Sequence, residues 1–111
     1  MEFKRLNNMT GKDPVMNRRI ASIFLNDFEA FKELFLSGTE QKQLDQIQFA
    51  LHKIKPRLVI FEMDDLVNQY EELLQIANSE VPSLEYEEKL IAVIKETEIK
   101  IAKVREFLIS L

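Results

Sequence analysis

The sequence predicts an all-α protein, and three observations support that class. Apolar residues recur at intervals of three and four over most of the chain, the period of one helix face, and alternating strand patterns are almost missing. Two glycines and three prolines in 111 residues leave room for few turns and favour long helices. The hydrophobic share of 46% and charged share of 31% suit one globular domain over residues 1–111. We therefore expect an antiparallel up-down-up-down four-helix bundle with a short N-terminal helix.

The N-terminal segment is expected to form the short helix. Phe3, Leu6 and Met9 lie on one side of a helical turn, as in a small amphipathic lid. The segment lacks the apolar stretch of a signal peptide, and no run in the chain approaches the roughly 20 apolar residues of a membrane span. A cytoplasmic location without membrane contact is the expectation.

The first long helix is expected over residues 14–36. Asp13 followed by Pro14 is typical of an N-cap and first helical position, because proline lacks only an N–H group that would be unpaired there. Ser37 and Gly38 are expected to end the helix. Its buried face is expected to consist of Ile20, Phe24, Phe28, Phe31 and Phe35.

The second long helix is expected to begin with Thr39 as N-cap and to carry the only histidine. Pro56 lies within it and has no N–H group for the carbonyl of His52. The apolar stripe stays in phase beyond the proline, so we expect a kink there; an end near residue 55 is the alternative. The stripe consists of Leu44, Ile47, Leu51, Ile54, Leu58 and Phe61.

Two further helices complete the prediction. Asp64 and Asp65 open the third, which is expected to end at 78–79 and to bury Leu66, Tyr70, Leu73 and Ala77. Pro82 and Ser83 precede the fourth, which is expected to run for roughly 27 residues, about 40 Å at the helical rise per residue. Its apolar seam consists of Leu90, Ile94, Thr97, Ile101, Val104, Leu108 and Leu111.

Composition excludes several classes of function. The absence of cysteine excludes disulfides and thiol catalysis, and a single histidine excludes a histidine metal cluster. Residues 1–60 carry a net +3 and residues 61–111 a net −7. Lys53, Lys55 and Arg57 form a basic neighbourhood that can attract an acidic or phosphorylated partner. Nucleic acid is not an expected partner, because the basic residues are few and the pI is about 5.1.

His52 is the candidate functional residue. It lies about 100° around the helix from Leu51, on the flank of the apolar stripe, where solvent can reach it. Lys55 and Gln48 share that flank, because side chains three and four residues apart are neighbours. No carboxylate stands at these spacings, so the flank suits a group that must carry negative charge.

The stretch Leu51-His52-Lys53-Ile54-Lys55-Pro56 resembles the Ala-His-x-Leu-Lys-Gly stretch of histidine-containing phosphotransfer (HPt) domains, matching it at the histidine, the aliphatic residue and the second lysine. The resemblance extends from Thr10 to Leu66. It implies a four-helix bundle and a phosphorelay intermediate, in which His52 accepts a phosphoryl group from a receiver-domain aspartate and passes it to another receiver.

The resemblance also implies that Lys55 would neutralise the phosphoryl charge. Our hypothesis adds Gln48 as a hydrogen-bond donor, and Phe49 and Val59 as an apolar rim against the receiver. The chain would be a monomeric phosphocarrier without kinase activity and with no cofactor of its own. Its partners would be response-regulator receiver domains or a hybrid sensor kinase. The receiver would bind the Mg²⁺.

The sequence departs from this pattern at three positions. Pro56 replaces the usual glycine, Arg57 stands where a small residue is common, and Glu62 stands where glycine often lets the next helix approach. Arg57 would either strengthen phosphate binding or obstruct docking, and Glu62 puts the local turn in doubt because a residue with a Cβ disfavours the left-handed conformation.

Two other functions remain open. The first is a non-catalytic helical adaptor, a degenerate HPt-like bundle that binds a partner without histidine chemistry. The second is an independent enzyme, which is disfavoured because no nucleophile-base pair, phosphate loop or metal cluster can be assembled. The pair Asp64 and Asp65 is best explained by helix capping, with a weak Mg²⁺ site as the alternative.

Overall fold

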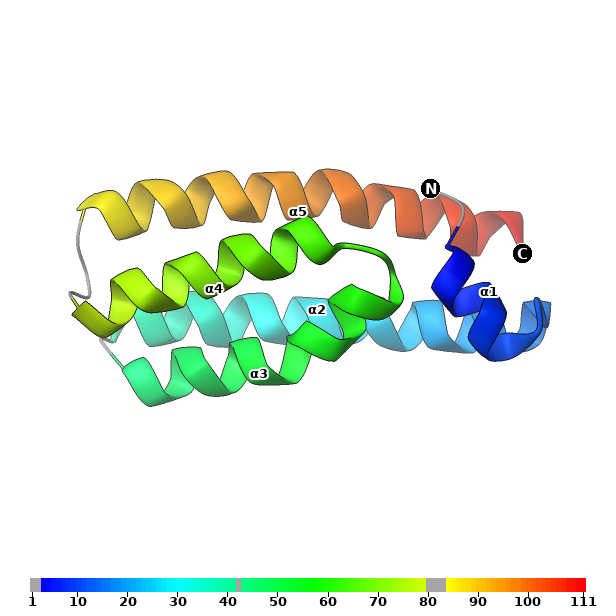
Figure 1. Ribbon diagram of the computed structural model, residues 1–111, viewed down its shortest axis with the longest axis horizontal. Coiled ribbons are helices and arrows are strands. Elements are labelled where there is room, and N and C mark those ends of the chain that lie inside the picture. Colours follow the sequence, from blue (N-terminus) through cyan, green and yellow to red (C-terminus); the bar gives the residue numbers. More distant parts are fainter. Residues whose placement is uncertain (1–2, 42, 80–83) are drawn as a thin grey trace.

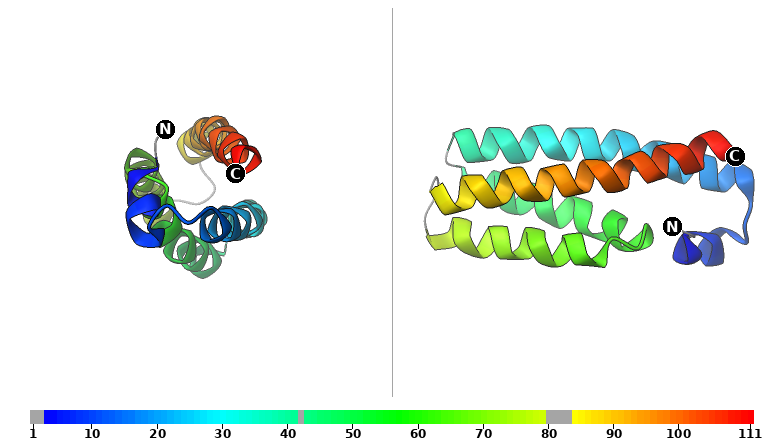
Figure 2. Two further views of the ribbon diagram at one scale, coloured as in Figure 1. Left: turned by 90° about the vertical axis from the view of Figure 1, so that its right-hand side faces the viewer. Right: turned by 90° about the horizontal axis from the view of Figure 1, so that it is seen from above.

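Every element of secondary structure in the described residues is a helix, as predicted. The computed structural model describes residues 3–41, 43–79 and 84–111, with 77–79 by their backbone alone. The elements are α1 (Lys4–Thr10), α2 (Pro14–Glu40), α3 (Leu44–Ile60), α4 (Asp64–Ser79) and α5 (Leu84–Ser110). They form an elongated body of 44 × 20 × 19 Å, with α1 beside one end (Figures 1 and 2).

The four long helices surround a common core. The most extensive packing joins α2 and α3; α3 also packs on α4, α4 on α5, and α5 on α2, while the small α1 lies against α2 (Figure 2). The largest fully buried side chains are Tyr70, Tyr86, Phe3, Phe24, Phe28, Phe35, Phe61, Leu6, Ile47, Ile54, Leu58 and Met63. Each helix therefore contributes one apolar face to the same interior, as its sequence period indicates.

The start of α2 is as predicted, but its end is not. Asp13 Oδ1 accepts hydrogen bonds from the amides of Val15 (2.9 Å) and Met16 (3.4 Å), which makes it the N-cap. The predicted end at Ser37 and Gly38 is wrong, because the helix continues to Glu40. Gly38 is instead a point of close approach: a Cβ there would lie 2.9 Å from Ile47 Cγ1 of α3.

The prediction that Thr39 caps the second long helix is also wrong. Thr39 is the penultimate residue of α2 and is 7% exposed. Its hydroxyl lies 3.0 Å from the Phe35 carbonyl and 3.0 Å from the Tyr86 hydroxyl of α5. Thr39 is a good capping residue, but here its buried hydroxyl has partners on two helices. This explains why Thr39 lies inside a helix and not at the start of one.

Helix α3 begins at Leu44 and passes through Pro56 to Ile60. The alternative of an end near residue 55 is therefore excluded, and the expected kink at the proline stays a prediction. The predicted stripe faces the core: Leu44 is half-buried, and Ile47, Leu51, Ile54, Leu58 and Phe61 are at most 3% exposed. The core face was predictable because it follows from helical spacing alone.

Helices α4 and α5 follow the predicted pattern. Leu66, Tyr70 and Leu73 are buried, while the side chain of Ala77 and the predicted turn at Pro82 and Ser83 lie outside the described residues. Helix α5 has 27 residues, as expected. Along its seam, Leu90, Thr97, Ile101 and Val104 are buried, and Ile94, Leu108 and Leu111 are half-buried.

The short N-terminal helix is present, and two of its three predicted contacts are made. Phe3 and Leu6 are buried, whereas Met9 is 57% exposed. Arg5 holds the helix against the end of α3 and the start of α4. Its guanidinium donates to both carboxylate oxygens of Asp64 (2.7 and 2.8 Å) and to the Val59 carbonyl (3.0 Å).

Candidate functional site

His52 lies two turns before the C-terminal end of α3, and its side chain is exposed. The ring lies at an open, shallow depression between α3 and α4, whose lining residues are Gln48, Leu51, His52, Lys55, Glu71 and Leu74. The structure thus brings His52, Lys55 and Gln48 to one surface, as their spacing indicates. Buried Leu51 anchors this turn of the helix in the core and leaves the imidazole at the surface.

Glu71 is the residue that sequence reasoning missed. It lies on α4, and its carboxylate is paired with the Lys55 ammonium of α3. Within α3, no carboxylate lies at helical spacing from His52. The sequence therefore predicted that this flank carries only a basic side chain and an amide. Only the packing of α4 beside α3 supplies the acid. The only local signal for Glu71 was its three-residue spacing from Leu74, which places the two side chains on one face of α4.

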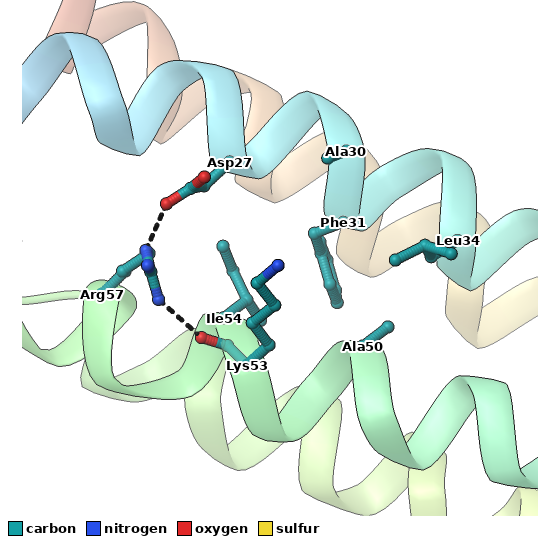
Figure 3. A pocket seen from close by; sticks show the side chains of 8 residues that line it. All are labelled: Asp27, Ala30, Phe31, Leu34, Ala50, Lys53, Ile54 and Arg57. Carbon is teal, nitrogen blue, oxygen red and sulfur yellow. Dashed lines mark hydrogen bonds and ion pairs between the residues drawn. The ribbon is translucent and has the colours of Figure 1, made fainter.

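The predicted basic neighbourhood is divided between two flanks of α3. Lys55 lies on the α4 side, whereas Lys53 and Arg57 lie on the α2 side (Figure 3). Arg57 is ion-paired through Nε with Asp27 of α2, and its terminal NH1 group donates to the Lys53 carbonyl (2.9 Å). Its guanidinium therefore binds protein groups on the α2 flank and does not line the depression at His52.

The residues around Arg57 enclose a small hollow between α2 and α3 (Figure 3). Phe31, Leu34 and Ile54 contribute apolar walls, and Ala30 and Ala50 leave the space open because their side chains are short. The Asp27–Arg57 ion pair closes one end of this hollow. We assign Arg57 a structural position that joins the last turn of α3 to α2.

The two apolar residues predicted to flank the site are both exposed. Phe49 is 59% exposed and Val59 is 38% exposed. Phe49 precedes His52 by three residues and Val59 follows it by seven, so both lie on the side of α3 that bears the imidazole. An exposed phenylalanine loses apolar contact with water when a partner covers it, which makes it a suitable docking residue.

The two remaining departures have defined geometries. Pro56 is exposed within α3, so its ring is accommodated without leaving the helix. Glu62 adopts a positive φ of 60°, the left-handed conformation that favours glycine, and its carboxylate accepts a hydrogen bond from the Arg5 amide (2.9 Å). The tight turn into α4 therefore forms without glycine.

The site offers the chemistry of an imidazole, an ammonium, an amide and the Glu71 carboxylate that is paired with the ammonium. Within residues 3–41, 43–79 and 84–111, no group of three or more metal-ligating side chains is close enough to hold an ion. None of the described helices has the length and apolar character needed to cross a membrane. An exposed imidazole beside a cation can act as a nucleophile toward an anionic centre, because the cation offsets the negative charge that accumulates on the product.

Comparison with known proteins identifies no relative: no protein-family model matches the chain, and neither a curated protein nor a solved structure shows significant similarity to it.

Proposed function

We propose that the chain is a phosphorelay intermediate in which His52 accepts a phosphoryl group from a receiver-domain aspartate and passes it to another receiver. The observation that carries this proposal is the exposed imidazole of His52 in an open depression that it shares with Lys55 and Gln48. An open site suits transfer between proteins, because the donor and acceptor aspartates must both reach the same nitrogen. Phosphoryl transfer depends mainly on positioning and on charge neutralisation, which these side chains can supply.

The proposal assigns each neighbour a role. Lys55 neutralises the phosphoryl oxygens, Gln48 donates a hydrogen bond to them, and Phe49 and Val59 contact the receiver. The receiver holds the Mg²⁺ and the acidic residues, so the chain needs no cofactor and has no kinase activity. Arg57 is left out of the binding set because Asp27 and the Lys53 carbonyl engage its guanidinium.

The fold supports the same proposal. Consecutive long helices pack on each other, the connections between them are short, and α5 returns to pack on α2. We infer an antiparallel up-down-up-down bundle, monomeric and cytoplasmic, in which α3 presents His52 on a rigid helix. Rigidity matters because a nucleophile held at a fixed position loses little entropy when the phosphoryl group arrives.

The test is phosphoryl transfer from phosphorylated receiver domains in the presence of Mg²⁺. The wild-type chain should acquire an acid-labile, alkali-stable label, and His52→Gln should abolish it. Because His52 is the only histidine, loss of the label identifies the acceptor without peptide mapping. Unchanged thermal unfolding of the His52→Gln variant would show that the fold is intact.

Two matched pairs of variants test the assigned neighbours. Lys55→Gln should slow labelling, whereas Lys53→Gln should leave it near the wild-type rate, because Lys53 lies on the α2 flank. Phe49→Ala should raise the receiver concentration needed for half-maximal rate, whereas Ile99→Ala, at an exposed position on α5, should not. If no receiver from the same genome labels the wild-type chain, the phosphorelay role is refuted and the adaptor function is favoured.

A further inference from the structure

The cation assigned to the phosphoryl group already has an anionic partner. The Lys55 ammonium is paired with the Glu71 carboxylate across the α3–α4 boundary. The pair borders the depression that also contains His52. Before any phosphoryl group arrives, the charge of Lys55 is therefore offset by an acid on another helix.

This pair can exchange partners. The Lys55 and Glu71 side chains are 47% and 42% exposed, and an ion pair that exposed to water contributes little to stability. A phosphoryl group carries close to two negative charges and three strong acceptor oxygens. It therefore attracts the ammonium more strongly than a single carboxylate does, and a lysine has enough rotatable bonds to move from one to the other.

Glu71 itself opposes the phosphorylated state. When Lys55 turns toward the phosphoryl group, the carboxylate loses its partner and stands near a second anion. Like charges at the edge of a shared depression repel each other, and salt weakens this repulsion because the groups are exposed. The same carboxylate that holds Lys55 beside His52 thus makes the phosphoryl group easier to lose.

We propose that Glu71 is a positioning residue: it holds Lys55 beside His52 until the phosphoryl group arrives, and then releases it. Phosphohistidine therefore forms at a prepared site, but it is hydrolysed faster than it would be without the carboxylate. This inference rests on the proposed acceptor role of His52. For a relay intermediate, a weakly held phosphoryl group is an advantage, since it must leave again for the next aspartate.

The inference can be tested without any receiver domain. Phosphoramidate phosphorylates the ring directly: the imidazole lone pair forms a new P–N bond, the P–N bond of phosphoramidate breaks, and ammonia leaves while the ring proton passes to the buffer. Hydrolysis then follows as water adds to phosphorus, the P–N bond to the ring breaks, and the ring nitrogen takes a proton from the water. The rate of this second step is measured by phosphorus NMR.

Glu71→Gln should slow hydrolysis of the phosphohistidine about threefold, the size expected for one exposed charge. Glu71→Asp, which keeps the charge, should restore most of the wild-type rate. Glu72→Gln is the matched control, because Glu72 is on the same helix but pairs with Lys89 (2.6 Å) rather than with Lys55. It should hydrolyse at the wild-type rate.

Ionic strength separates a charge effect from a structural one. Added salt should slow the wild type toward the rate of Glu71→Gln, with no change in the melting temperature of either protein. Equal hydrolysis rates for Glu71→Gln and Glu72→Gln, or a difference that salt leaves unchanged, would overturn the role of Glu71. A wild-type chain that reacts with phosphoramidate but takes no label from receivers would instead refute the relay, so the two failures are distinguishable.

Discussion

Glu62 has a backbone conformation that normally favours glycine. Its φ of 60° places it in the left-handed region, where a Cβ crowds the following carbonyl at a cost of roughly 1–2 kcal/mol. Its side chain offsets part of this cost by accepting a hydrogen bond from the Arg5 amide (2.9 Å). A glycine would adopt this conformation without the cost.

We therefore predict that Glu62→Gly is more stable than Glu62→Ala. Both variants lose the hydrogen bond from Arg5, but only alanine retains the Cβ, so the free energies of unfolding should differ by about 1 kcal/mol in favour of glycine. Urea denaturation of the two variants measures the difference. Equal stability would mean that the turn changes conformation when the side chain is shortened.

Two pairs of buried hydroxyls link α5 to other helices. Tyr70 lies 2.8 Å from the Thr97 hydroxyl, which also donates to the Val93 carbonyl (2.7 Å). The second pair joins Thr39 and Tyr86. Burial raises the pKa of Tyr70 far above its usual range, although the hydrogen bond with Thr97 opposes the shift, so the phenol stays protonated and donates to the Thr97 hydroxyl oxygen.

Thr97→Val should destabilise the protein by about 2 kcal/mol, because it leaves the buried Tyr70 hydroxyl without its partner. The double variant Tyr70→Phe with Thr97→Val should recover part of this loss, since removing both polar groups is nearly neutral. Thermal unfolding of the three variants provides the test. A double variant less stable than Thr97→Val alone would contradict the pairing.

At the scale of the element, α2 and α3 show which structural features local sequence patterns predict and which they do not. Their buried faces, and the N-cap of α2 at Asp13, follow from spacing and residue type. The end of α2 does not, because Gly38 and Thr39 carry strong local signals that their tertiary surroundings override. Gly38 serves close packing against Ile47, and Thr39 is buried against α5.

We predict that Gly38→Ala is destabilising, contrary to its effect at an exposed helix position. Alanine in an exposed helix interior would gain about 1 kcal/mol over glycine. Here the added Cβ would lie 2.9 Å from Ile47 Cγ1 and 3.4 Å from the Gln43 carbonyl oxygen, so either the buried Ile47 side chain or the two helices must shift. A net loss of about 1 kcal/mol or more is expected in urea denaturation. A gain in stability would show that this shift occurs without cost.

At the scale of the whole molecule, α1 covers one end of the helical body. Phe3 packs against Phe61 and Phe107, with ring centroids 5.6 and 4.7 Å apart. The paired contacts of Arg5 with Asp64 add an electrostatic link between α1 and the start of α4. The N-terminal segment thus completes a core that the four long helices leave open at this end.

The link between Arg5 and Asp64 should make the attachment of α1 sensitive to pH. The hydrogen bond from Arg5, supported by its charge and only partly opposed by desolvation, lowers the pKa of Asp64 below its ordinary value of 3.8. A lowered pKa in the folded state stabilises the fold above the ordinary value, and that stabilisation is lost as the pH falls through the lowered pKa.

Wild type and Asp64→Asn should therefore differ in stability at pH 6 and converge as the pH falls below 3.8. Unfolding measured across this range tests the prediction, and the protection factors of the α1 amides against hydrogen exchange should fall in parallel in the wild type. A stability difference that persists at pH 2.5 would show that Asp64 acts through something other than its charge.

The sequence alone determined the helical class, the face that each long helix buries, and the exposed position of His52 with Lys55 and Gln48, because all of these depend on spacing within one helix. Only the tertiary structure decided the partners of the charged groups. Glu71 meets Lys55 and Asp27 meets Arg57, because the rotation and displacement of neighbouring helices bring these side chains together. Those two quantities depend on how all the apolar faces pack at once, and no local pattern of residues encodes them.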